Sequence, residues 1–285
     1  MMKKMKYIVA SALCLVALSC SKEVSPLADD SLQDVAFEVS LHSLSETKAV
    51  SDGTSADILY YEIYAGDKKV ESRTIDRMQE GLFRFNTRLV KCQKYDVLFW
   101  AQDRSCTAYD TGNLRKVTVN YSDAVANDES RDAFFGYVRD MEVDPDAHVN
   151  VRNIELRRPF ALICVGTSEK DWNAYSPSSL VSSVSLTGSF PTVFDVLEGS
   201  ASEPVSQVDF TSAPAPSETF TAESEEFHLI AMAYVLAPDG EDNTASLTVN
   251  AGFDGKYMEL RVDDVPYASN FRTNLTGDLF NHRVQ

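Results

Sequence analysis

Short strand patterns fill most of this 285-residue chain, and they constrain its fold more than any other feature. Residues 35–41 alternate apolar with polar side chains, as a strand with one buried face does. Residues 95–101 are apolar throughout, which predicts a central strand of a sheet. The whole pattern predicts about thirteen short strands and no long amphipathic helix. We therefore expect an all-β protein of one or two β-sandwiches, not a doubly wound α/β fold.

The remaining elements follow from the same reading. We expect further strands at 58–65, 82–85, 116–121, 134–138, 149–156, 160–166, 181–186, 192–197, 227–236, 245–252 and 258–262. Residues 168–175 predict one helical turn, and Ser122 is expected to cap another short helix. Residues 199–217 contain three prolines and predict a loop.

The first twenty residues have the pattern of an export signal. Lys3, Lys4 and Lys6 precede an apolar run of about a dozen residues, too short for the roughly 20 that span a membrane. The run ends at Cys20, and this ending resembles a lipobox, in which the Cys20 thiol is lipidated and becomes the first residue after cleavage. Several acyl chains, at about 0.8 kcal/mol per buried CH₂, would then anchor the protein in the membrane. The alternative is an ordinary signal peptide with a chance cysteine.

The residues after Cys20 bear on where the protein is held. Position 21 is serine and not the aspartate that retains many lipoproteins at the inner membrane, so the outer membrane is favoured. The sequence SKE at 21–23 faintly resembles a surface-export signal of Bacteroidota lipoproteins. We expect 1–20 to be the signal, 21–33 a flexible tether, 34–145 an N-terminal β-sandwich domain and 146–285 a C-terminal one.

Charge and composition exclude some functions. The formal net charge is −17, and loss of the three signal lysines makes it more negative still. A surface this acidic repels nucleic acid, so we expect no nucleic-acid partner. With 44% hydrophobic and 24% charged residues, the chain has the composition of a globular protein. Cys92, Cys106 and Cys164 are expected to form no disulfide and to act as small hydrophobic residues.

The chain carries no recognisable catalytic or metal-binding constellation. Its four histidines are scattered, and His228 falls in an alternating strand pattern, where a half-exposed structural role is expected. The acidic stretch 239–243 lacks the spacing of a calcium loop and predicts a solvated turn. We therefore predict no cofactor, no metal and no enzymatic activity, with a hydrolase of unrecognised site as a remaining alternative.

Two tryptophans allow a different function, glycan binding. Trp100 lies in an apolar run and is expected in the core. Trp172 stands between Asp171 and Asn173 in a loop-like stretch and is the better candidate for a sugar contact.

Several segments together resemble the fimbrillin-type lipoproteins, the type V pilin superfamily of Bacteroidota, over residues 35–280. None of them is catalytic, and the closing stretch 270–279 is the most specific. They are TKA (47–49), SDG (51–53), LYYEIY (59–64), RDAFFG (131–136), LRRPFA (156–161), VP (265–266) and NFRTNLTGDL (270–279).

This resemblance implies two transthyretin-like β-sandwich domains and a maturation step. A trypsin-like protease would cut after Lys48, and the strand 35–41 would leave a groove for a strand of another pilin subunit. The alternative is that Lys48 is only a surface lysine. Polymerising members carry extra C-terminal strands that can serve as the donor, and the sequence ends at Gln285 without them. Unless the donor comes from elsewhere, the resemblance implies a terminal or accessory subunit that accepts a strand without donating one, or a lipoprotein that never polymerises. We thus predict a pilus accessory, tip or anchor subunit, or an adhesin, held at the outer membrane by its lipid.

Overall fold

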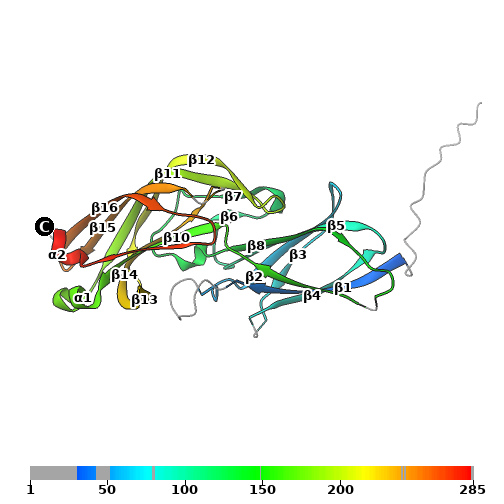
Figure 1. The fold of residues 1–285 in the computed structure, drawn as a ribbon, viewed down its shortest axis with the longest axis horizontal. Helices are drawn as coiled ribbons and strands as arrows, with labels where there is room; N and C mark the ends of the chain where they lie inside the picture. The colour runs from blue at the N-terminus through cyan, green and yellow to red at the C-terminus, as the bar shows by residue number, and fades with distance from the viewer. Residues whose placement is uncertain are drawn as a thin grey trace, which may run out of the picture.

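The structure, a computed structural model, describes residues 31–42, 52–78, 81–147, 149–238, 240 and 242–283. The predicted signal 1–20, the lipidation residue Cys20 and the cleavage residue Lys48 lie outside the described residues. Two β-sandwiches follow each other along the molecule, as Figure 1 shows. The all-β prediction with two sandwiches is confirmed.

The first sandwich faces one sheet of three strands with another of four. The three-stranded sheet has the order β4 (Phe83–Val90), β1 (Leu32–Leu41), β9 (Asn150–Leu156). The four-stranded sheet has the order β3 (Lys68–Asp76), β2 (Ile58–Ala65), β5 (Lys94–Gln102), β8 (Phe134–Glu142).

The second sandwich is built in the same way from two larger sheets. One has the order β13 (Thr219–Ala222), β14 (Glu225–Leu236), β10 (Phe160–Ser168), β17 (Arg272–Gly277). The other has the order β16 (Lys256–Pro266), β15 (Thr244–Phe253), β11 (Val181–Asp195), β7 (Val117–Val119), β6 (Tyr109–Asp110), and β12 (Ser200–Pro214) also pairs with β11. The helices are η2 (Leu114–Lys116), η3 (Glu129–Arg131), α1 (Glu169–Tyr175) and α2 (Leu279–Arg283). No helix of the described residues has the length and apolar character needed to cross a membrane.

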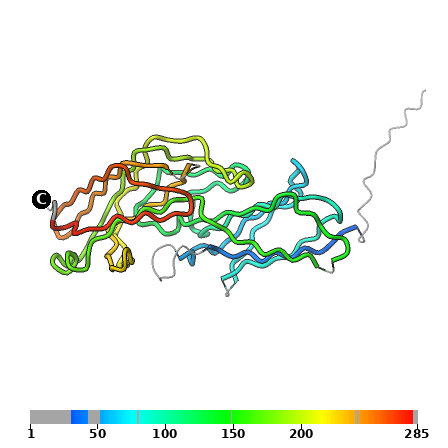
Figure 2. Tube along the Cα trace, in the orientation of Figure 1, coloured from blue at the N-terminus to red at the C-terminus, as the bar shows by residue number. Residues whose placement is uncertain are grey.

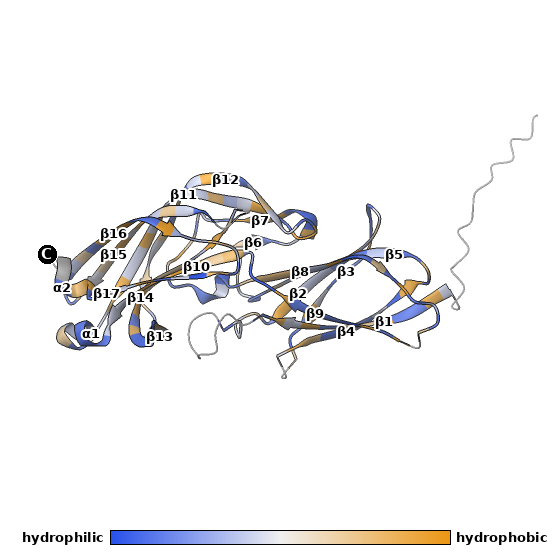
Figure 3. Ribbon diagram, viewed as in Figure 1, coloured by the Kyte–Doolittle hydropathy of each residue, from blue (hydrophilic) through white to orange (hydrophobic). Residues whose placement is uncertain are grey.

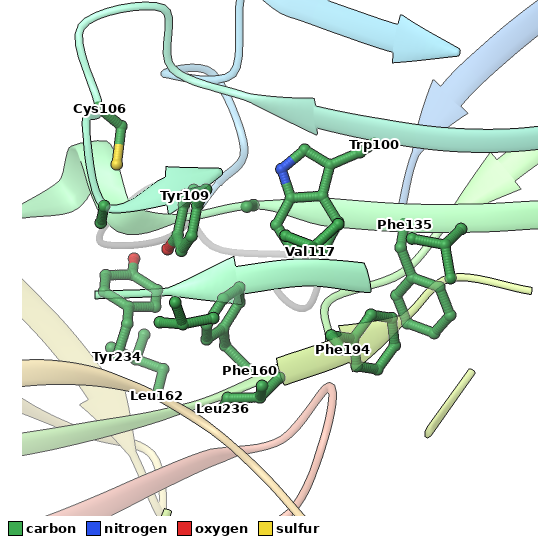
Figure 4. Close-up of a cluster of buried hydrophobic side chains, with 14 of the residues drawn as sticks. Trp100, Cys106, Tyr109, Val117, Phe135, Phe160, Leu162, Phe194, Tyr234 and Leu236 are labelled. Atoms are coloured by element: carbon green, nitrogen blue, oxygen red, sulfur yellow. The ribbon is translucent and has the colours of Figure 1, made fainter. Parts of the chain in front are cut away.

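Strand alternation explains how a single strand contributes to two of the four buried hydrophobic clusters of the described residues. Along β5, Val97 and Phe99 point into the first sandwich, while Leu98 and Trp100 point to the opposite face. That opposite face packs against the second sandwich through the cluster in Figure 4, which includes Trp100, Phe160 and Phe194. The orange colour of β10 in Figure 3 reflects a strand that is also buried on both faces. The two sandwiches therefore share a continuous apolar core at their junction.

Strand pairing bears on the expected domain limits. The strand β9 follows residue 145 but pairs with β1 in the first sandwich. The segment from β6 to β7 precedes residue 145 but pairs with β11 in the second. We keep a two-domain division as a proposal, in which 109–119 is counted with the second sandwich and 150–156 with the first.

The expected loop at 199–217 was wrong, because most of it is the edge strand β12. This strand pairs with β11 from Ser200 to Pro214 and exposes most of its side chains. Pro204 and Pro214 are compatible with an edge strand, since a proline there removes no ladder hydrogen bond from a second neighbour. The two short strands expected at 181–186 and 192–197 are parts of one strand, β11, with a register shift between Thr187 and Phe190.

Two smaller expectations also need correction. Ser122 caps no helix; its backbone N–H donates to Oδ1 of Asn120 (2.9 Å) in a turn. Cys106 and Cys164 are buried free thiols, as expected of small hydrophobic residues, but Cys92 is exposed. Cys92 lies in the turn between β4 and β5 at a φ of 58°, so turn geometry and not packing governs this position.

Candidate functional site: the first strand and the domain junction

The first strand, β1, is the central strand of its sheet. Figure 2 shows it as the blue segment beside the green β9. It pairs antiparallel with β4 from Leu32 to Val39 and parallel with β9 from Val35 to Leu41. Both of its backbone edges are therefore hydrogen-bonded. Its removal would open two unpaired edges, one on β4 and one on β9, which is the geometry of a groove for an added strand.

The inward face of β1 fills the core of the first sandwich. Val35, Phe37 and Val39 are fully buried. The ring of Phe37 stacks on Phe85 (centroids 5.0 Å apart, 20° between planes) and meets the edge of Phe99 at 5.7 Å. The groove thus has three successive positions for apolar side chains at every second residue.

The outward face of β1 is polar and contributes little energy. Glu38 pairs with Arg84 at 3.2 Å and Asp34 pairs with Arg88 at 3.6 Å, directly across the strands. All four side chains are largely exposed, and such pairs contribute about 0–1 kcal/mol. The inward face therefore determines which sequence fits between β4 and β9.

A buried ion pair holds the far end of β1. Arg158 donates from Nε and Nη2 to the two carboxylate oxygens of Asp132, at 2.6 and 2.8 Å, and both residues are fully buried. The same guanidinium donates from Nη1 to the carbonyl of His42 (3.2 Å) and lies 4.3 Å from the ring centroid of Phe134. The backbone N–H of His42 donates to the carbonyl of Leu156 (2.7 Å). The last described residue before the Lys48 segment is thus fixed to the domain junction.

Three of the segments that carry the family resemblance meet at this junction. Phe135 and Arg157 exchange backbone hydrogen bonds of 2.8 and 3.0 Å. The N–H of Arg158 donates to Oδ1 of Asn270 at 3.2 Å, which adds the closing segment. Because these residues bind each other, the resemblance reports how the two sandwiches are joined; Asn270 also lines a surface pocket of about 460 Å³ formed by residues 266–271.

Trp172 lies on α1, at the end of the molecule opposite to the start of β1 (Figure 1). The helical turn expected at 168–175 is confirmed, with the Ser168 hydroxyl accepting from the N–H of Asp171 (3.1 Å). The indole is half-buried, and His228 stacks flat on it with centroids 4.4 Å apart. His228 in turn contacts Glu169 at 2.5 Å between Nε2 and Oε2, and this hydrogen bond lowers the pKa of the Glu169 carboxyl. One face of the indole is therefore occupied by a protein side chain.

Two carboxyl groups, one fully buried and one partly buried, were not anticipated from the sequence. Asp171 is fully buried and accepts from the Thr167 hydroxyl and the Phe280 N–H, both at 2.7 Å, and so ties α2 to α1. Glu129 lies beside Glu218, Asp52 and Asp132, and its Oε1 is buried without a hydrogen-bond partner. Burial and then these acidic neighbours raise the pKa of Glu129 to about 7. An aspartate or glutamate between ordinary polar residues gives no sequence signal that it will be buried.

In chemical terms, the site without β1 would offer backbone edges and apolar pockets. Among the described residues, no group of three histidine, cysteine, aspartate or glutamate side chains could hold a metal ion. Geometry of this kind suits association with another strand.

Comparison with known proteins gives one family and a set of similar folds. The family described as "Family of unknown function (DUF6562)" matches residues 31–285. No curated protein matches the sequence.

Among solved structures, a candidate cell adhesion protein from Bacteroides ovatus ATCC 8483 has a TM-score of 0.51 at 13% identity, over 89% of this chain and 94% of that one. A candidate cell adhesion protein from Bacteroides uniformis ATCC 8492 gives 0.49 at 11% identity, over 87% and 93%. The fimbrial anchor protein Mfa2 from Porphyromonas gingivalis gives 0.40 at 12% identity, over 75% and 78%. At these identities the first likeness shows a shared fold, and the resemblance predicted from the sequence is confirmed at that level.

Proposed function

We propose that this chain, which belongs to the family of unknown function DUF6562, is a non-catalytic surface lipoprotein of fimbrillin type. In this proposal Cys20 carries the lipid that holds the uncut chain at the outer membrane. When the chain is cut after Lys48, β1 leaves together with the lipidated N-terminus and a strand of another subunit takes its place; an uncut chain stays an anchored lipoprotein that keeps β1. The role is that of a pilus accessory, tip or anchor subunit, or of an adhesin.

The observation that carries the proposal is the position of β1. It is the first strand of the chain, yet it lies in the middle of a sheet between β4 and β9. Its three buried side chains contribute about 1.5–3 kcal/mol each, so the strand supplies a large part of the 5–15 kcal/mol that stabilises a typical domain. The first sandwich therefore needs a strand in this place, and release of β1 has to be coupled to insertion of another.

The ladder also defines the strand that would replace β1. It must run antiparallel to β4 and parallel to β9, with apolar side chains where Val35, Phe37 and Val39 now lie. A one-residue shift would turn these side chains to the solvent face, so the register is strongly selected.

The first test is the mass and N-terminal sequence of the protein purified from native membranes. A lipidated N-terminus at Cys20 indicates an anchored lipoprotein that keeps β1. An unlipidated N-terminus at Ala49 indicates removal of β1. Any other N-terminus contradicts the proposed processing.

A reconstitution experiment tests the groove itself. A chain that starts at Ala49 is mixed with a synthetic peptide of the β1 sequence, and its urea denaturation is measured. We expect the peptide to restore cooperative unfolding, and the same peptide with Asp at the Phe37 position to fail, because that position has no room for a charge without a partner. If both peptides act alike, the groove does not select a strand.

Glycan binding through Trp172 is a second proposal, favoured by the place of α1 at the end of the molecule remote from the start of β1 (Figure 1). A glycan-array signal that is lost in Trp172→Ala and kept in Trp100→Phe supports it. Absence of any glycan signal for the intact protein contradicts it and leaves strand exchange untouched.

A further inference from the structure

A polar cavity lies among the loops that connect β5 to β8. Its volume is about 120 Å³. Three segments form it: the loop after β5 with Cys106 and Thr107, the turn after β7 with Asn120 and Asp123, and the turn η3 with Arg131. Figure 4 shows Cys106 on the first of these loops, beside Tyr109.

Arg131 lines this cavity, and its guanidinium has no counter-ion among the described residues. Its side chain is only 4% exposed. It donates from Nη2 to the carbonyl of Asn120 (3.0 Å), whereas its Nε is buried without a partner. Within the described ranges no carboxylate lies within 4.0 Å of this guanidinium. The rings of Tyr121 and Phe210 stand 5.6 and 5.9 Å away, near the limit for a cation–π contact.

A buried cation in this state is unusual, because buried charges in proteins are normally paired. The missing partner would be an acceptor, and a carboxylate matches the planar donor fork of a guanidinium. Phosphate or sulfate fits less well, because the rim of the cavity carries negative charge.

Two carboxyl groups make up that rim. Asp123 is exposed, and Asp128 is half-buried, its Oδ1 accepting from the N–H and hydroxyl of Ser130 at 3.0 and 2.6 Å. Thr107 and Asn120 are also exposed there. The positive charge of the lining is thus on a buried side chain and its negative charges are on more exposed ones, an arrangement that repels a simple anion and attracts a ligand with opposite charges at its two ends.

Local hydrogen bonds hold these walls in place. The N–H of Asn120 donates to the carbonyl of Ala108 (2.8 Å), and the hydroxyl of Tyr109 donates to the carbonyl of Arg131. Asp103 accepts from both the N–H and the hydroxyl of Ser105, at 2.7 Å each. A cavity with fixed walls is a better ligand site than a gap between mobile loops, because less order is lost on binding.

We propose that this cavity binds a small zwitterion of the α-amino acid class, with its carboxylate on Arg131 and its ammonium group at Asp123 and Asp128. The site is independent of strand exchange, and its volume limits it to a free amino acid of small side chain.

The test measures binding of three probes, L-serine, acetate and methyl glucoside, by ligand-detected NMR with the full mature chain. We expect L-serine to bind with a dissociation constant of about 1 mM or tighter, and methyl glucoside not to bind. In Asp123→Asn, L-serine should bind about fivefold more weakly while acetate binds more tightly, because one rim charge is removed. The matched control is Asp263→Asn, an exposed carboxylate on β16 with the same change of charge, which should alter neither probe.

The opposite response of the two probes distinguishes a charge effect from a folding defect. Arg131→Met should abolish binding of both probes, but it also changes the packing of a buried side chain. The decisive variant is therefore Asp123→Asn, at an exposed position. Failure of L-serine to bind at about 10 mM overturns the proposal. Equal weakening of both probes in Asp123→Asn overturns it as well, and so does binding of methyl glucoside in place of L-serine.

Discussion

The buried ion pair between Arg158 and Asp132 makes a quantitative prediction about the domain junction. Arg158→Met would leave the Asp132 carboxylate in the core without its cation and would remove the hydrogen bond to the carbonyl of His42. Loss of one partner of a buried pair costs about 3–5 kcal/mol. Asp132→Asn should cost a similar amount, because it leaves the buried guanidinium without its charge partner.

The double variant distinguishes an ion pair from general packing. When Arg158→Met and Asp132→Asn are combined, no uncompensated charge remains, so the loss should be smaller than the sum of the single losses by about 2 kcal/mol or more. The matched control is the exposed pair of Lys116 and Glu203, 3.3 Å apart, where Lys116→Met and Glu203→Gln should each cost less than about 1 kcal/mol.

The assay is urea denaturation of the mature chain at pH 7, followed by tryptophan fluorescence and circular dichroism together. Trp100 reports on the junction, since it is buried in the apolar cluster that the two sandwiches share. Coincidence of the two signals shows whether one free energy describes the transition. If Arg158→Met costs less than about 1 kcal/mol, or if the single losses add up in the double variant, the reasoning about this pair is refuted.

Three further predictions concern single side chains. Phe37→Ala should lower the free energy of unfolding by about 3–5 kcal/mol in denaturant titrations, because it empties the middle of the groove; a loss as small as that of an exposed substitution would contradict this packing. Glu129 has a raised folded-state pKa of about 7, so its protonated form stabilises the protein fully below pH 4.5 and the contribution is lost as the pH rises through 7. Allowing for its partial exposure, Glu129→Gln should gain about 1–2 kcal/mol at pH 8 and little at pH 4.5, and equal effects at the two pH values would contradict the shift. Asp171→Ala should detach α2 and raise hydrogen exchange at the Phe280 amide, whereas unchanged protection there would mean that α2 is held by other contacts.

The strand β1 gives the proposed function its physical basis. A central strand at the start of a chain can be exchanged without cutting any later connection. Its sheet also presents two backbone edges to the incoming strand, so that orientation and register are both specified. His42 leaves together with β1 when the chain is cut after Lys48, so the junction then loses its hydrogen bonds to His42, whereas the ion pair of Arg158 with Asp132 lies in the part of the chain that remains.

Local patterns in the sequence were sufficient to predict the strands that are buried on one or both faces. The strand β2 spans Ile58–Ala65 as expected, and β5 lies between β2 and β8 as its apolar run predicted. Trp100 is in the core, as predicted. These predictions succeed because side-chain burial on a strand follows a period of two residues, which any window of sequence displays.

The same sequence patterns did not predict the edge strands β3 and β12. Both β3 and β12 expose most of their side chains, so neither shows the alternation or apolar content that marks a strand. They are strands because a neighbour supplies hydrogen bonds along one side, β2 for the first and β11 for the second. A neighbour of this kind is a property of the folded chain.

The sequence by itself thus determined the fold class, the buried strands and the pattern expected of an exported lipoprotein. Only the tertiary structure decided that β1 pairs in parallel with β9, more than a hundred residues later in the chain. It alone brought Arg158 to Asp132 and left Arg131 buried with no counter-ion in the part of the chain that the structure describes. The physical reason is that the burial pattern of a strand depends on the order of apolar and polar side chains within a few residues of sequence. The choice of pairing partner and the burial of a charge depend instead on the free energy of the whole packed structure.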